Sequence, residues 1–299
     1  MRTTPCLVIL APLAWVCTSA LAQTPIRDGP FQKLVLDGFE DTQAWGPAEA
    51  TVEPDREHVR GGTSALHLGI DVNWETGEKA YPIGWPRTQR SLGERWQQDW
   101  TAYDFLHFWV YTTTSRDALP DDPLGLILYT PDKPRAYSRT LSELRKDAWV
   151  EIRIPVEAIP RPSQVTFIQF FISESNYRHG DRVDFYISDL ALLRYAEPTL
   201  DTLRVGQKVM YADARYLPVH VRTFGIPPRA RTPLWITVLR AGKAITRASQ
   251  EVGRGEGMLW IDLGAKPAAP GECEVRARLK ESTAPAKADV FRVVASPWR

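Results

Sequence analysis

The chain has 299 residues, and its 37 lysines and arginines almost balance its 36 aspartates and glutamates, for a formal net charge of +1. This balance argues against a general nucleic-acid binder or a protein that binds anionic membranes, because both need a basic excess. Two of the three cysteines lie within the first 17 residues, which leaves Cys273 alone in the rest of the chain and excludes a disulfide framework.

The first 22 residues have the pattern of a secretory signal peptide. Arg2 gives a positive start, residues 7–16 form a short apolar run, and Ala20-Leu21-Ala22 is an A-x-A cleavage motif. The apolar run is too short to cross a bilayer, and no later stretch approaches the ~20 apolar residues that a membrane helix needs. We therefore predict a cleaved signal peptide, a secreted or periplasmic protein, and no membrane insertion.

From Phe31 the pattern is β nearly throughout, and no helical periodicity of useful length interrupts it. Short apolar or alternating runs recur about every 8–12 residues with turn residues between them, which favours a β-sandwich or jelly roll. In the first part of the chain the predicted strands cover residues 33–36, 64–70, 105–111, 124–129, 137–141, 149–154, 165–173 and 183–193.

The texture of the sequence changes after residues 195–198, where Glu197-Pro198 closes the first unit. Shorter strands follow, separated by Gly, Pro and polar turns, as in a small immunoglobulin-like sandwich without its disulfide. These strands are predicted at residues 219–222, 234–239, 257–263, 274–279 and 288–294. The predicted plan is all-β: a signal peptide at 1–22, a jelly-roll β-sandwich at 23–197, and a smaller immunoglobulin-like β-sandwich at 198–299.

The segment 81–111 holds four of the eleven tryptophans, and Gly84 and Pro86 make its first half a loop. Exposed aromatic rings stack on the C–H faces of sugars, whose hydroxyls bond around the ring edge. Trp100, Trp109 and Trp149 lie in or beside apolar strands and are assigned to the core. The aromatic candidates for sugar binding are Trp74, Tyr81, Trp85, Trp96, Tyr137 and Tyr177.

Arginines accompany these aromatics, and Arg87, Arg135 and Arg178 are the predicted polar partners of a ligand. A guanidinium offers a planar fork of donors that grips a carboxylate or sulfate. If the arginines converge, an acidic polysaccharide is the better substrate class. If they point to neighbouring acids, they are solvated surface pairs of little energetic weight.

Five motifs between residues 36 and 194 occur in an order with a known counterpart: DGFED, GGTSAL, DWTAYDFLHFWVY, AWVEIRIP and DFYISDLALLR. This order resembles a carbohydrate-binding-module jelly roll of the galactose-binding-like type, and the following domain resembles the immunoglobulin-like accessory domains of such modules. The resemblance implies a structural calcium, with Glu40 and Asp189 at the matching acidic positions. The sequence departs from the family at Ser188, where many relatives have a second aspartate.

We therefore predict a non-catalytic carbohydrate-binding protein whose partner is a polysaccharide or glycan. One alternative is a polysaccharide lyase or glycoside hydrolase that uses the Tyr177-Arg178-His179 loop, which supplies a base and a uronate-neutralising group. No paired-carboxylate motif for glycoside hydrolysis stands out. A second alternative is a protein-binding scaffold of the cell envelope, with a protein as its partner.

Overall fold

The structure is a computed structural model that describes residues 24–75, 83–264, 269–280 and 282–298. Its regular elements are nearly all strands, so the predicted all-β class is confirmed. The helical elements of the described residues are one turn of α-helix, α1 (Arg95–Gln98), and two 3₁₀ turns, η1 (Val156–Ala158) and η2 (Glu174–Asn176). None of the helices in these ranges has the length and apolar character needed to span a bilayer.

The longest strand, β12, is the centre of the first sheet. One edge of β12 pairs with β7, which pairs in turn with β10; the other edge pairs first with β5 and then, past an irregularity after Ser188, with β2. Strand β4 completes the sheet beside β5, and β1 completes it beside β2. Its seven strands are β1 (Ile26–Asp28), β2 (Phe31–Asp37), β4 (Thr51–Asp55), β5 (Ala65–Asp71), β7 (Phe105–Thr114), β10 (Trp149–Pro155) and β12 (Arg182–Tyr195).

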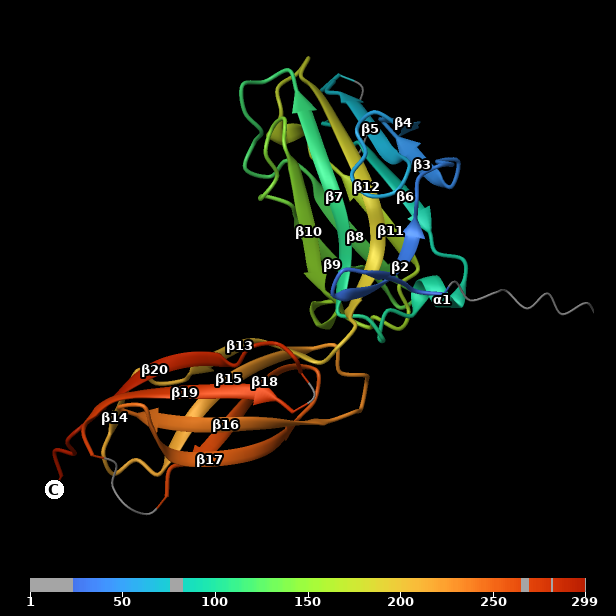
Figure 1. Cartoon of the computed structure of the whole chain (residues 1–299). Helices are drawn as coiled ribbons and strands as arrows, with labels where there is room; N and C mark the ends of the chain where they lie inside the picture. Colours follow the sequence, from blue (N-terminus) through green and yellow to red (C-terminus); the bar gives the residue numbers. More distant parts are fainter. Residues whose placement is uncertain (1–23, 76–82, 265–268, 281, 299) are drawn as a thin grey trace, which may run out of the picture.

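A five-stranded sheet packs against the seven-stranded one, and in Figure 1 β7, β10 and β12 lie in front of β8 and β11. Alternate residues of β11 and β8, such as Ile168, Phe170 and Leu126, are fully buried between the sheets. Each buried side chain of this size contributes about 1.5–3 kcal/mol. The order of this sheet is β3 (Trp45–Ala48), β6 (Arg87–Ser91), β11 (Phe167–Phe171), β8 (Gly125–Thr130) and β9 (Lys133–Thr140).

The second pair of sheets begins at β13 and shares no strand with the first pair. Cys273 is a free thiol, as the sequence predicted, and it is buried in the core of this second pair. One sheet has three strands: β13 (Thr199–Val205), β15 (Tyr216–Phe224) and β18 (Gly255–Asp262). The other has five: β14 (Val209–Tyr211), β20 (Lys287–Val294), β19 (Gly271–Leu279), β16 (Thr232–Arg240) and β17 (Lys243–Val252). We call the two pairs the N-terminal and C-terminal sandwiches.

The two sandwiches meet end to end where β12 leads into β13 (Figure 1), and a buried contact joins them there. Phe224 of the C-terminal sandwich packs on Phe105, with ring centroids 4.6 Å apart, and stacks on Tyr195 at 6.0 Å. The carboxylate of Asp104, which is 3% exposed, accepts the backbone N–H groups of both Tyr195 and Gly225. Aromatic packing and shared hydrogen bonds therefore hold the sandwiches in one relative orientation.

Candidate functional site

The outer face of the five-stranded sheet carries the candidate site. Because successive side chains of a strand point to opposite faces, the burial of Ile168 and Phe170 places Phe167, Gln169 and Phe171 on the outside. The register then aligns Arg87 of β6 with Phe171, and Gln89 with Gln169. This face therefore combines aromatic, amide and guanidinium groups on neighbouring strands.

Trp85, just before β6, is the residue on which two arginines and a phenylalanine of this face converge. The guanidinium carbons of Arg87 and Arg135 each lie 4.7 Å from the centroid of its ring, and the ring of Phe171 meets it edge-on at 5.6 Å. Arg135 comes from β9, on the far side of the sheet from β6. We call these four residues (Trp85, Arg87, Arg135 and Phe171) the Trp85 cluster. Two of the three predicted arginines, Arg87 and Arg135, therefore converge on one ring.

A glycine makes room for the cluster. Phe171 pairs with Gly125 across β11 and β8, and a β-carbon at Gly125 would overlap the Phe171 ring. The ring can therefore lie over the backbone of β8 and lean against Trp85. The exposed Arg135 has a positive φ of 52°, an unusual conformation for a residue with a β-carbon, which turns its backbone at this point of β9.

Glu174, a residue that the sequence did not single out as a ligand or support, fixes the backbone on both sides of the cluster. Its carboxylate is 3% exposed and accepts the N–H of Gly84 at 2.9 Å and the N–H of Asn73 at 2.9 Å. Its carbonyl accepts the indole N–H of Trp74 at 3.2 Å. Glu49 adds a bond from the N–H of Trp85 at 2.6 Å. The buried carboxylate of Glu174 therefore fixes the residues that precede Trp74 and Trp85 in the chain.

The polar residues beside the cluster can bond a ligand. The partly exposed Tyr129 donates to the side-chain oxygen of Gln169 at 2.9 Å, and Gln169, which is 1% exposed, holds the Tyr129 hydroxyl in place without reaching a ligand itself. Gln89 and Ser138 are exposed on the same face. An indole with hydroxyl, amide and guanidinium donors around it is an arrangement that can bind a sugar.

Two predicted aromatic residues point into the protein and are not brought to the Trp85 cluster. Tyr177 is 2% exposed, and its hydroxyl donates to the carbonyl of Pro123 at 2.6 Å. Tyr137 pairs with Leu128 and packs on the core from the inner side of β9. The alternation signal was weak in both segments because prolines and polar residues surround them.

The Tyr177-Arg178-His179 loop does not assemble the catalytic group that the enzyme alternative requires. Burial raises the pKa of Tyr177 far above its usual value, which opposes a role as base. The backbone of Arg178 bonds to Asp181, and the side chain of His179 accepts the N–H of Trp74. Arg178 borders a separate hollow, with Arg116 and Asp181, and does not join the Trp85 cluster.

Two further candidates cannot be compared with the structure. Tyr81 lies outside the described residues, and although Trp96 belongs to α1, its side chain is not described. A third residue of the aromatic segment, Arg90, faces inward and forms an ion pair with Asp37. Trp74 is 41% exposed and available at the surface.

The proposed calcium ligands, Glu40 and Asp189, lie against the turn at residues 61–63, but each already has a protein partner. Glu40 accepts the hydroxyl of Thr63 at 2.7 Å, whereas Asp189 pairs with the ammonium of Lys33 at 2.5 Å, and both members of that pair are almost buried. A fixed ammonium beside Asp189 disfavours a divalent cation, so these residues do not fit the ion well. No group of three or more His, Cys, Asp or Glu side chains that could hold a metal occurs in the described ranges. The calcium site stays a prediction.

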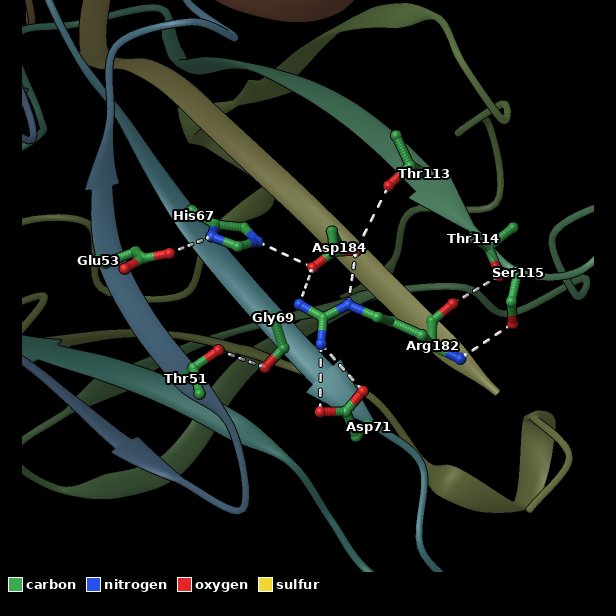
Figure 2. Close-up of polar contacts among 10 residues, drawn as sticks. All are labelled: Thr51, Glu53, His67, Gly69, Asp71, Thr113, Thr114, Ser115, Arg182 and Asp184. Atoms are coloured by element: carbon green, nitrogen blue, oxygen red, sulfur yellow. Dashed lines mark hydrogen bonds and ion pairs between the residues drawn. The ribbon is translucent and has the colours of Figure 1, made fainter. Parts of the chain in front are cut away.

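Figure 2 shows a polar network on the opposite, outer face of the seven-stranded sheet. His67 lies between Glu53 at 3.0 Å and Asp184 at 2.8 Å, and Arg182 donates to Asp184 and to Asp71. The hydrogen bond with Asp184 is the largest cause that raises the pKa of His67. Since each carboxylate of this network has a protein partner, the network stabilises the sheet.

Aromatic rings cover the rest of that face. His58, from the loop after β4, stacks on Tyr186 with centroids 4.0 Å apart, and Arg60 of the same loop lies over Trp109 at 4.2 Å. Trp109 and Trp149 were assigned to the core but are partly exposed here, while Trp100 is fully buried as predicted. Because His58 and Arg60 of the loop cover Tyr186 and Trp109, we place the candidate site on the five-stranded sheet.

The sequence matches no protein-family model and no curated protein. Among solved structures, it is similar to a β-1,2-glucanase from Parabacteroides distasonis, with 13% identity over 88% of this chain and 36% of that chain, and a TM-score of 0.38. A family 11 carbohydrate-binding module from Clostridium thermocellum, in complex with a β-1,3-1,4-mixed-linked tetrasaccharide, aligns at 16% identity over 54% of this chain and 94% of the module, with a TM-score of 0.36. CBM27-1 of Caldicellulosiruptor saccharolyticus, in complex with mannohexaose, aligns at 16% identity over 54% of this chain and 96% of that chain, with a TM-score of 0.35. The chain thus spans about a third of the glucanase, and likeness at this level assigns no ligand to it.

Proposed function

We propose that this protein is a secreted, non-catalytic carbohydrate-binding protein that holds a polysaccharide against the Trp85 cluster. The observation that carries the proposal is the convergence of Arg87 and Arg135 on one partly exposed indole at the surface of a sheet. The sheet and the buried Glu174 support fix the position of this indole, so little conformational entropy remains to be lost on binding.

The charge of the cluster favours a glycan with carboxylate or sulfate groups. Arg135 is exposed, its guanidinium lies over Trp85, and it forms no ion pair with a carboxylate within the described ranges, so it can take an anionic substituent of the ligand. A guanidinium that stacks on an aromatic ring keeps its planar edge of donors free for such a group. A sugar ring would then lie beside Trp85 while its acidic group meets Arg135.

A glycan panel tests the proposal, with neutral β-glucans and mannans beside polysaccharides that carry uronate or sulfate. We expect residues 23–299 to be retained by an acidic glycan and Arg135→Ala to weaken that retention. Arg56→Ala, an exposed arginine of the loop after β4, is the matched control and should bind as the wild type does. A folded protein that none of the glycans retains would overturn the proposal and favour the scaffold alternative.

A further inference from the structure

The outer face of the three-stranded sheet in the C-terminal sandwich carries a hollow of about 640 Å³. Its lining comes from all three strands of that sheet, β13, β15 and β18. It includes Gly206, Arg204, His220, Arg222, Glu256 and Met258. The hollow lies far along the chain from the Trp85 cluster and belongs to a different sandwich.

The strand register explains which groups this face presents. Arg204, His220 and Met258 form one row across the sheet, and Thr202, Arg222 and Glu256 form the next. The apolar residues between the two rows, Leu203 and Val221, turn inward and are buried. The outer face therefore has two rows that combine guanidinium, imidazole, hydroxyl and carboxylate groups.

An apolar strip continues from these rows along β15 and β18. Trp260 is 58% exposed, Met258 50% and Tyr216 46%, and Trp260 pairs across the sheet with Pro218. Gly206 lies beside the same proline, where a β-carbon would come within 3.2 Å of the Pro218 ring. A free indole face thus stands next to a hollow with polar walls.

We infer that this face is a second glycan-contact surface, which takes a further stretch of the same polysaccharide chain. The inference rests on the proposed function of the Trp85 cluster for the identity of the ligand. An exposed indole offers the stacking face, and Arg204, His220 and Glu256 offer donors and acceptors at the ring edge. Together they match the amphipathic surface of a sugar.

The composition of the hollow favours a glycan over a protein partner. Protein interfaces place a fully desolvated apolar cluster at their centre and charged groups at the rim. Here the concave part has charged walls, and the apolar strip lies beside it on the outside. Peptide addition to the edge strand β18 is the competing occupant, and the experiment below separates the two.

The junction between the sandwiches fixes the position of the second surface relative to the Trp85 cluster. Arg222 forms an ion pair with Glu157 of the N-terminal sandwich, so the polar end of the hollow borders the junction. The aromatic contact around Phe224 and the bonds to Asp104 fix the relative orientation of the two surfaces. Binding of a long chain at one surface then raises its effective concentration at the other.

The test is a length series of the glycan that the panel identifies, titrated against the full chain and its variants. For long chains, Trp260→Ala should weaken binding about tenfold, the effect of one lost stacking contact, while short oligomers that reach only the Trp85 cluster should bind unchanged. His220→Ala should act in the same direction. Trp235→Ala, a 43% exposed tryptophan on the other sheet with Arg278 over its ring, is the matched control.

The outcomes distinguish the two proposals. If Trp260→Ala binds glycan chains of every length as tightly as the control Trp235→Ala does, the second surface is overturned and the Trp85 proposal stands. If Trp85→Ala binds normally and Trp260→Ala does not, the Trp85 proposal fails and the second surface remains. Capture of a peptide on β18, blocked by Trp260→Ala with no effect of that change on glycan affinity, would also overturn the inference.

Discussion

Replacement of Asp104 by alanine should uncouple the two sandwiches. One oxygen of this carboxylate accepts the N–H of Tyr195 at 2.8 Å, from the end of β12, and the N–H of Gly225 at 3.0 Å, from the C-terminal sandwich. The residue is 3% exposed, so water cannot replace the lost acceptor without opening the junction. Asp104→Ala therefore strands two buried donors at one point.

The expected cost follows from these two donors. A buried N–H left without an acceptor costs about 1–3 kcal/mol, so the pair costs about 2–6 kcal/mol. Burial raises the pKa of Asp104, which means that its ionised form is itself destabilised by desolvation, and removal of the charge returns part of the loss. We therefore expect a net loss of about 2–4 kcal/mol in the free energy of unfolding.

Denaturant unfolding and calorimetry measure this effect. Asp104→Ala should separate the transitions of the two sandwiches, whereas Asp104→Asn, which keeps an acceptor oxygen, should lose less. Asp121→Ala, at an exposed loop position, is the control and should stay within about 0.5 kcal/mol of the wild type. A single cooperative transition for Asp104→Ala at the stability of this control would refute the account of the junction.

Three further predictions concern other parts of the N-terminal sandwich. The raised pKa of His67 means that its ion pairs stabilise the fold fully below about pH 6.5 and that this stabilisation is lost as pH rises through the folded-state pKa. His67→Gln should therefore flatten the pH dependence of the free energy of unfolding in this range, and an unchanged profile would contradict this. Gly125→Ala should push the Phe171 ring against Trp85 and weaken glycan retention, at a stability cost of about 1–3 kcal/mol. Gly46→Ala, whose added β-carbon would have its nearest neighbour at 4.0 Å, is the control and should retain glycan as the wild type does. Equal retention by the two variants would count against the Trp85 cluster. Lys33→Met should cost about 3–5 kcal/mol because it removes the ammonium paired with the buried carboxylate of Asp189 and leaves that carboxylate with the more distant imidazole of His107, at 3.7 Å. A calcium chelator should not change Tm, and a chelator-sensitive Tm would instead support the calcium site.

Much of the fold could be predicted because its central strands carry a strong apolar signal. The predicted strands at 105–111, 149–154 and 183–193 correspond to β7, β10 and β12. Strands β6 and β17 were missed because they lie near sheet edges and are polar. The inward positions of β6 are Thr88 and Arg90, so its alternation has no hydrophobic signature.

The candidate site was predicted in part. The residue types in the loop before β6 pointed to Trp85 and Arg87, but only the pairing of β8 with β9 brings Arg135 to them across the sheet. Phe171 was hidden in an apolar run, although alternation within it separates the outward Phe167, Gln169 and Phe171 from the buried Ile168 and Phe170. Glu174 gave no signal, because its role depends on backbone donors about a hundred residues away.

Isothermal titration of the retained glycan against three proteins tests the central claim most directly. Trp85→Ala should raise Kd about 30-fold, the loss of ~2 kcal/mol at a central aromatic contact, while the wild type and Trp235→Ala should bind alike. Equal affinities of Trp85→Ala and Trp235→Ala, with both variants folded, would contradict the assignment of glycan binding to the Trp85 cluster.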